Sequence, residues 1–308
     1  MTDPLMTALA PDCVAMRQAA VEKGLPPVWQ LDADTAFRLH LEANLASRAA
    51  WQPPLDSLPV RVADLESVDG RVPLRQYLPE NADPSTAVAW IHGGGWVLGN
   101  LETADAICRT LCDATGWAVV SVDYRCAPRH PFPAPVDDVI TALDWILGSW
   151  DRVIVAGDSA GATLAAVAAQ RLVGRPALVG QLLIYPATDP WLRSGSAREF
   201  VEGPFLARRD MEWFYDRYVD PQHRADPRVD LTGSAASAGV PAIVFTVGHD
   251  PLRDEGIAYA RALADAGGFV EWIHAPDLYH GSFTQCGVLP TAAARVLEVC
   301  AAAQRVFA

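Results

Sequence analysis

A serine flanked by small residues is the first feature of this chain that could do covalent chemistry. The segment Gly157-Asp158-Ser159-Ala160-Gly161 follows the apolar run at 152–156 and precedes an alanine-rich helical pattern at 162–172. That order is typical of a nucleophile elbow, a sharp strand-to-helix turn that exposes the serine hydroxyl. The spacing of glycine, serine and glycine alone also arises by chance. Here the segment stands between an expected strand and an expected helix, and this context makes the match specific. The pattern predicts that Ser159 attacks a carbonyl carbon.

A glycine run supplies the second chemical feature. His92-Gly93-Gly94-Gly95-Trp96 stands directly after the apolar run at 87–91. Glycines let backbone N–H groups approach a substrate oxygen, and the residue after an elbow serine contributes one more N–H. We therefore predict an oxyanion hole made by Gly94, Gly95 and Ala160, which would stabilise charge that develops only in the transition state.

The serine also needs a base, because its hydroxyl is a weak nucleophile at neutral pH and a histidine oriented by a carboxylate activates it. Around a nucleophile elbow the chain order is serine, acid, histidine, with the acid and histidine placed after late strands. Asp250 comes after the apolar run at 241–247, and His280 follows the run FVEWIH and an expected loop APDLY. We predict a catalytic triad of Ser159, Asp250 and His280.

Three neighbouring residues are alternatives to this assignment. His249 precedes the predicted acid, and His274 falls within or at the end of a strand, so His280 is the better base. Asp254 is the rival acid, although its place at the start of an expected helix also suits an N-terminal cap.

Apolar runs separated by helical patterns predict the scaffold that positions these residues. Val60–Leu65 and Val72–Leu78 flank Asp69-Gly70, a dipeptide suited to a tight hairpin turn, so the sheet begins with antiparallel strands. Later runs are continuous rather than alternating, which is typical of strands buried on both faces. They lie at 87–91, 117–122, 152–156, 182–186 and 241–247. Together these runs predict an α/β fold with a doubly wound, mostly parallel sheet and helices on both faces.

Two segments interrupt this alternation and predict a helical cap. The first fifty residues look helical, with Asp32 and Asp34 as candidates for the helix start. Between 187 and 239 a polar, aromatic stretch intervenes, which a helical insertion explains better than a long unstructured loop. We expect a single domain over 1–308, with a cap formed from about 1–52 and 188–238.

The expected cap also bears on the substrate pocket. Its aromatic residues either line that pocket or anchor the insertion, and the sequence does not decide between these roles. The side chains that we place at the pocket are Trp96, Asp158 and Trp213. The acids of the insertion that we expect to be solvated are Glu202, Asp210 and Asp216.

Composition excludes several classes of partner. The chain has 308 residues and a formal net charge of −13, which argues against nucleic acid, because Lys and Arg supply that affinity by neutralising phosphates. The amino terminus lacks a basic region, and no run of about eighteen apolar residues occurs, so we expect neither export nor a membrane partner. The expected location is the cytoplasm, and the residues do not decide between a monomer and a homodimer.

The cysteines fit the same location. Six cysteines in a chain of this length suit reduced cytoplasmic thiols better than a disulfide framework. Cys108 and Cys112 share an expected helix face, but no further ligands accompany them, so we expect no metal site. The predicted chemistry needs no cofactor.

The combination of motifs resembles the hormone-sensitive lipase-like family of esterases, which have the α/β-hydrolase fold. The matching segments are HGGGW at 92–96, YRCAPRHPFPA at 124–134, GDSAG at 157–161, DPLRDEG at 250–256 and HGSF at 280–283. Arg129 replaces a usual glutamate and Ala162 a frequent glycine, and neither position belongs to the triad or the oxyanion hole. The resemblance implies hydrolysis of small carboxylic esters with short to medium acyl chains, through an acyl-enzyme on Ser159.

Two alternatives remain at this stage. An amidase, formamidase or lactonase would use the same triad, because the cap decides which leaving group is accepted. A small-molecule receptor on the same scaffold would bind its ligand without turnover. Receptors of this kind lack the catalytic histidine, whereas His280 is present here.

Overall fold

An eight-stranded sheet runs through the computed structural model, which describes residues 7–80, 84–203 and 205–307. In space the strand order is β1-β2-β4-β3-β5-β6-β7-β8. The strands are β1 (Val60–Val68), β2 (Val72–Pro79), β3 (Thr86–Ile91), β4 (Ala118–Val122), β5 (Arg152–Asp158), β6 (Leu178–Ile184), β7 (Ala242–His249) and β8 (Val270–Tyr279). Strands β3 to β8 pair in parallel, so their carboxyl ends meet at one edge.

The first two strands form the predicted antiparallel hairpin. Asp69 and Gly70 connect them with φ angles of 52° and 66°, as a tight turn of this kind requires. Strand β2 then pairs antiparallel with β4, which joins the hairpin to the parallel part of the sheet. The α/β fold with a mostly parallel sheet is confirmed.

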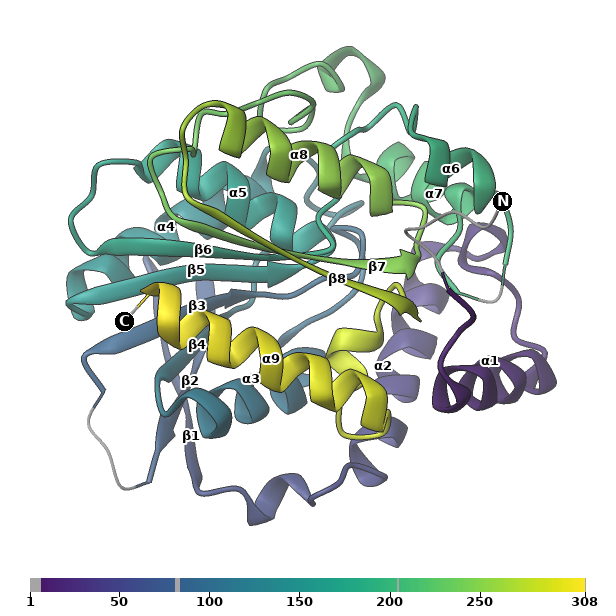
Figure 1. Cartoon of the computed structure of the whole chain (residues 1–308), viewed down its shortest axis with the longest axis horizontal. Coiled ribbons are helices and arrows are strands. Elements are labelled where there is room, and N and C mark those ends of the chain that lie inside the picture. The colour runs from purple at the N-terminus through teal and green to yellow at the C-terminus, as the bar shows by residue number, and fades with distance from the viewer. Residues whose placement is uncertain (1–6, 81–83, 204, 308) are drawn as a thin grey trace.

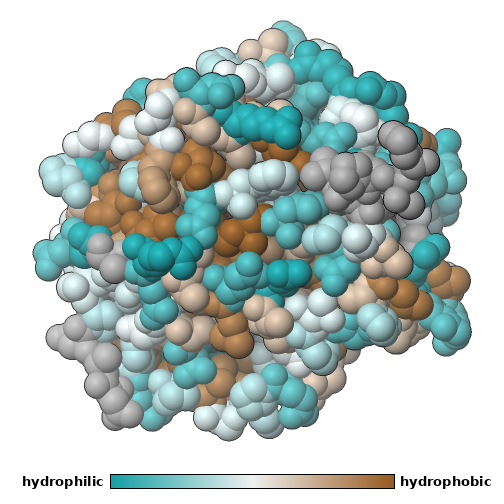
Figure 2. Space-filling view, viewed as in Figure 1, coloured by the Kyte–Doolittle hydropathy of each residue, from teal (hydrophilic) through white to brown (hydrophobic). Residues whose placement is uncertain are grey.

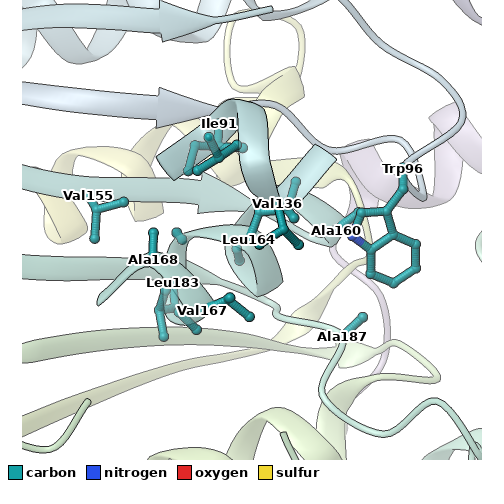
Figure 3. Close-up of a cluster of buried hydrophobic side chains, with 14 of the residues drawn as sticks. Ile91, Trp96, Val136, Val155, Ala160, Leu164, Val167, Ala168, Leu183 and Ala187 are labelled. Atoms are coloured by element: carbon teal, nitrogen blue, oxygen red, sulfur yellow. The ribbon is translucent and has the colours of Figure 1, made fainter. Parts of the chain in front are cut away.

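Helices cover both faces of the sheet, as Figure 1 shows. The helices α3 (Leu101–Thr115) and α9 (Pro290–Phe307) pack on one face, and the other carries α4 (Ala134–Ser149), α5 (Ala160–Leu172) and α8 (Arg253–Asp265). Apolar residues between helices and sheet form two cores, one on each face. In Figure 3, Leu164 and Val167 of α5 lie beside Leu183 of β6, so the helix that follows Ser159 is anchored by its apolar side.

Further helices gather where the parallel strands end (Figure 1). They are α1 (Pro11–Lys23), α2 (Ala33–Ala49), α6 (Gly195–Glu199) and α7 (Arg208–Tyr218). Short 3₁₀ turns are η1 (Val28–Gln30), η2 (Leu55–Ser57), η3 (Pro221–His223) and η4 (Ser282–Gln285). Asp32 begins α2 as expected, because its carboxylate accepts a hydrogen bond from Thr35 N at 2.9 Å. All four helices come from the two predicted cap segments, whose residues 1–6 and 204 lie outside the described chain.

An ion network fastens α2 to the main domain. Arg48, near the end of α2, lies 2.8 Å from the carboxylate of Asp105 on α3. Asp105 is 1% exposed and also accepts hydrogen bonds from Arg109 at 2.9 Å and Tyr77 at 3.1 Å. Because a buried carboxylate is stable only when it is paired, these contacts fix α2 against α3.

The structure corrects three expectations. Strand β6 ends at Ile184, before the expected end, because Tyr185 has a φ of 37° that a strand cannot continue. The segment APDLY belongs to β8 instead of a loop. Asp210 is 7% exposed instead of solvated, since its carboxylate accepts a hydrogen bond from Ala207 N at the start of α7. Glu202 and Asp216 are exposed.

Polar and apolar residues mix on the outer surface, and Figure 2 shows apolar residues gathered between α8 and α9, where the edge strand β8 passes. Phe269 and Trp272, at the start of β8, are 57% and 40% exposed. Among the described residues, no helix is both long enough and apolar enough to cross a bilayer.

Candidate active site

Ser159 occupies a strained turn between β5 and α5. Its φ and ψ angles are 54° and −121°, a backbone conformation that side chains other than glycine seldom adopt. The turn is also crowded, since a Cβ on Gly157 or Gly161 would press on the carbonyl oxygen of Ile91. The two glycines therefore allow the chain to turn sharply enough to expose the serine hydroxyl.

Two hydrogen bonds link the serine to the predicted histidine and acid. Ser159 Oγ lies 2.9 Å from His280 Nε2, and His280 Nδ1 lies 2.9 Å from Asp250 Oδ2. Asp250 is fully buried, and its other oxygen accepts a hydrogen bond from Leu252 N at 2.8 Å. Each of the three residues follows the end of a parallel strand: Ser159 follows β5, Asp250 follows β7 and His280 follows β8. Because the carboxyl ends of these strands lie at one edge of the sheet, the three side chains meet there.

The rival residues lie elsewhere. His249 Nε2 is 2.8 Å from the carbonyl oxygen of Thr7. The ring of His274 lies inside β8 and contacts the hydroxyl of Thr246 at 2.9 Å. Asp254 accepts a hydrogen bond from Ser196 N at 2.8 Å.

The glycine run forms a loop beside Ser159. Gly94 and Gly95 have φ angles of 110° and 60°, and a Cβ on Gly95 would overlap the ring of Phe214. Within the described chain neither of their N–H groups donates to another protein atom. Ala160 begins α5, so its N–H is at the helix start, where N–H groups lack partners within the helix. The three N–H groups can therefore meet a developing oxyanion.

Asp158 supports this loop from beneath. Its carboxylate accepts a hydrogen bond from Gly93 N at 2.8 Å. Burial raises the pKa of Asp158 to about 6, although the Gly93 N–H and the nearby His280 oppose that rise. At neutral pH the carboxylate is therefore largely ionised.

His92 is neutral at the same pH. Burial lowers its pKa to about 4, and its Nδ1 lies 2.8 Å from the carbonyl oxygen of Gly93. Because Nδ1 faces an acceptor, it carries the proton, and Nε2 presents a lone pair. That Nε2 is buried, and no residue in the described part of the chain forms a hydrogen bond with it.

A cavity of about 310 Å³ opens above Ser159 and His280. Its walls come from α2, the glycine loop, the start of α3, the segment before and within α7, and η4. The lining residues beyond the glycine loop include His40, Asn44, Ser47, Trp90, Ile107, Leu206, Met211, Phe214, Thr284 and Gln285.

Of the three predicted pocket residues, only Asp158 lines this cavity. Trp96 is instead buried in a flat stack on Tyr218, with ring centroids 4.4 Å apart. Trp213 donates from its indole nitrogen to the Leu31 carbonyl at 3.1 Å and borders a separate surface hollow. Both tryptophans therefore anchor α7.

Sequence reasoning missed several residues near Ser159. The ring of Tyr185 packs on His280 at 4.4 Å between centroids, which restricts the tilt of the imidazole. His40 and Asn44 of α2 face the cavity, and their spacing of four residues is the signal that places them on one helix face. Phe214 carried no such signal, because it stands among other aromatic residues of the insertion.

Arg129, the departure from the family pattern, lies on the surface, where its guanidinium pairs with Asp34 of α2 at 2.9 Å. No group of three or more His, Cys, Asp or Glu side chains within the described ranges could hold a metal ion.

Comparisons with known proteins agree with this geometry. A family profile described as an alpha/beta hydrolase fold matches residues 88–284. The chain is 39% identical over 264 residues to carboxylic ester hydrolase LipN of Mycobacterium tuberculosis, covering 77% of this chain and 69% of that protein. It is 36% identical over 297 residues to an ethyl acetate hydrolase of Pseudomonas putida, covering 89% and 91%. A solved hyperthermophilic esterase from the archaeon Pyrobaculum calidifontis is similar in fold, with a TM-score of 0.88, 31% identity and coverage of 97% of this chain and 99% of that one.

Proposed function

The chain belongs to the hormone-sensitive lipase-like family of α/β hydrolases, and we propose from this membership that it is a serine carboxylesterase acting through Ser159, His280 and Asp250. One observation carries the assignment of residues: the two consecutive 2.9 Å contacts from Ser159 to His280 and from His280 to Asp250. They lie at the floor of a cavity that admits a small ester.

The chemistry follows from these contacts. His280 takes the Ser159 proton through Nε2 as the serine oxygen attacks the ester carbonyl. Asp250 holds the proton on Nδ1 and so keeps the tautomer in which Nε2 is free to act as a base. His280 then protonates the departing alcohol, and a water molecule that it activates releases the acid from the acyl-enzyme.

The N–H groups of Gly94, Gly95 and Ala160 stabilise the tetrahedral oxyanion in this proposal. Their support is the open backbone geometry of the loop and the position of Ala160 at the helix start. Loss of one such donor typically reduces the rate by about two to three orders of magnitude.

The cavity size supports short to medium substrates. About 310 Å³ is at the lower end of the usual range for ligand pockets, roughly 300 to 1,000 Å³. Similarity to a protein named for ethyl acetate hydrolysis favours the same range. In the same proposal, segments 1–52 and 188–238 act as a cap, since α2 and α7 supply walls of the cavity.

A cytoplasmic location is also part of the proposal. All six cysteines are free and five of them are buried, as suits a reducing compartment. Cell fractionation would check it, and sedimentation would decide between a monomer and a homodimer.

The experiment that tests the proposed function measures initial rates on p-nitrophenyl esters from acetate to palmitate. We expect turnover of the short esters and essentially complete loss in Ser159→Ala. Ser149→Ala is the matched control, because Ser149 is exposed at the end of α4 and should leave the rates unchanged.

Equal activity of Ser159→Ala and wild type would overturn the assignment of the nucleophile. Faster turnover of an anilide than of the matched phenyl ester would instead favour an amidase. Tight binding of esters with no product release would favour the receptor alternative.

A further inference from the structure

An unpartnered indole N–H lies at the cavity wall. Trp90, in β3, is completely buried and lines the cavity, yet its Nε1 has no hydrogen-bond partner among the residues that the structure describes. Buried N–H groups are almost always paired, and leaving one unpaired destabilises the fold. A tryptophan can only donate, so its missing partner is a hydrogen-bond acceptor.

A second donor comes from η4. Gln285 lines the cavity, and its Oε1 accepts a hydrogen bond from the hydroxyl of Tyr279. That contact orients the amide, and within the described chain its Nε2 donates to no other residue. The turn η4 packs on α3, and Ile107 of α3 belongs to the same apolar core as Trp90. Ile107, Trp90 and Gln285 all line the cavity.

His92 completes this group with an acceptor. It lies just beyond the end of β3, two residues after Trp90. Its Nε2 lone pair is buried and unpartnered, and the residue lines the cavity. Two donors and one acceptor together match a hydroxyl group, which can accept and donate at once.

The position of η4 indicates which half of an ester this wall would meet. His280 must protonate the departing alkoxide, so the alcohol oxygen lies beside His280 Nε2. The turn η4 begins two residues after His280, and we therefore place Gln285 on the alcohol side of the cavity. The acyl chain, attached on the other side of the carbonyl carbon, points away from this wall.

We propose that Trp90, His92 and Gln285 form a subsite for a hydroxyl group on the alcohol half of the substrate. The enzyme therefore prefers esters of diols and other polyols over esters of simple alkanols of the same size. This inference rests on the proposed ester hydrolysis at Ser159 and deepens it.

The test compares 2-hydroxyethyl acetate with propyl acetate, two esters that differ by a hydroxyl in place of a methyl. The measured quantity is the ratio of their kcat/KM values, in wild type and in Trp90→Phe and Gln285→Glu. Phenylalanine removes the N–H and keeps an aromatic ring, while glutamate retains an acceptor for Tyr279 and removes the donor. Comparing ratios between proteins cancels the intrinsic difference in ester reactivity.

We expect wild type to favour the hydroxylated ester and each variant to lower the ratio about fivefold, as the loss of one neutral hydrogen bond of about 1 kcal/mol predicts. Trp145→Phe, at a half-exposed position of α4, is the matched control and should leave the ratio unchanged. Gln285 lies at the cavity wall outside the two cores, so its variant remains informative if Trp90→Phe unfolds.

An unchanged ratio in Gln285→Glu and in folded Trp90→Phe, with both esters still hydrolysed, would overturn the subsite and leave the esterase proposal intact. Failure of wild type to hydrolyse either ester would instead count against the proposed function.

Discussion

Replacing Asp158 with asparagine should make the protein more stable and less active. The carboxylate is held at the end of β5 against Gly93, where burial raises its pKa from 3.8 to about 6. Asparagine has nearly the same shape and can still accept the hydrogen bond from Gly93 N through its amide oxygen. It carries no charge, so the variant avoids the cost of burying one.

The magnitude follows from the pKa. A group whose pKa is raised by folding binds its proton more tightly in the folded state, so stability falls as pH rises through the interval from 3.8 to about 6. Since one pKa unit is about 1.4 kcal/mol, the ionised carboxylate costs about 3 kcal/mol at pH 8 and about half that at pH 5. Asp158→Asn should recover this amount, or about 5 °C in Tm at pH 8 for a chain of 308 residues.

Activity should change in the opposite direction. The Asp158 charge interacts favourably with a protonated His280, which forms during catalysis. Loss of about 1 kcal/mol of this interaction reduces kcat about fivefold.

Urea unfolding at pH 5 and pH 8, together with kcat on p-nitrophenyl acetate, measures both effects. Asp151→Asn, at an exposed position before β5, is the control and should change neither quantity. If Asp158→Asn is folded but no more stable than wild type at pH 8, the buried charge of Asp158 does not destabilise the protein as we infer.

Three further substitutions test other parts of the site. Gly95→Ala should lower kcat on p-nitrophenyl acetate by about a hundredfold or more, because the new methyl overlaps Phe214 and would displace the oxyanion donor that we propose. A normal kcat would contradict this expectation. Gly161→Ala should destabilise the fold by at least about 2 kcal/mol in urea unfolding, since its Cβ meets the Ile91 carbonyl. Asp105→Asn should lower the free energy of unfolding by about 3 kcal/mol, because it leaves the arginines at the contact between α2 and α3 without their buried charged partner. The same change should raise KM, since α2 lines the cavity. An unchanged KM would show that the position of α2 does not affect substrate binding.

The fold could be predicted from the sequence because its strands are buried on both faces. Continuous apolar runs, such as the one that became β5, have no other stable place than between two layers of helices. The positions of Ser159, Asp250 and His280 relative to strand ends then followed from topology. Parallel strands bring their carboxyl ends to one edge whatever the sequence distance between them.

The cavity wall was not predictable in the same way. Trp96 belongs to the motif HGGGW and Trp213 to the aromatic insertion, but the side-chain direction at both positions depends on tertiary packing that no periodicity encodes. Isolated acids usually are solvated, which predicts Asp210 at the surface, whereas its carboxylate caps the start of α7. His40 and Asn44 were overlooked, since polar residues on an amphipathic helix normally face water.

The central claim is that Ser159 is the nucleophile that forms the covalent intermediate. The most direct measurement is labelling with a p-nitrophenyl alkylphosphonate, followed by intact mass analysis and peptide mapping. We expect one adduct per chain, on the peptide that contains Ser159, with loss of esterase activity in parallel and no adduct in Ser159→Ala. An adduct on another residue, or an active enzyme that the phosphonate inactivates without labelling Ser159, would contradict it.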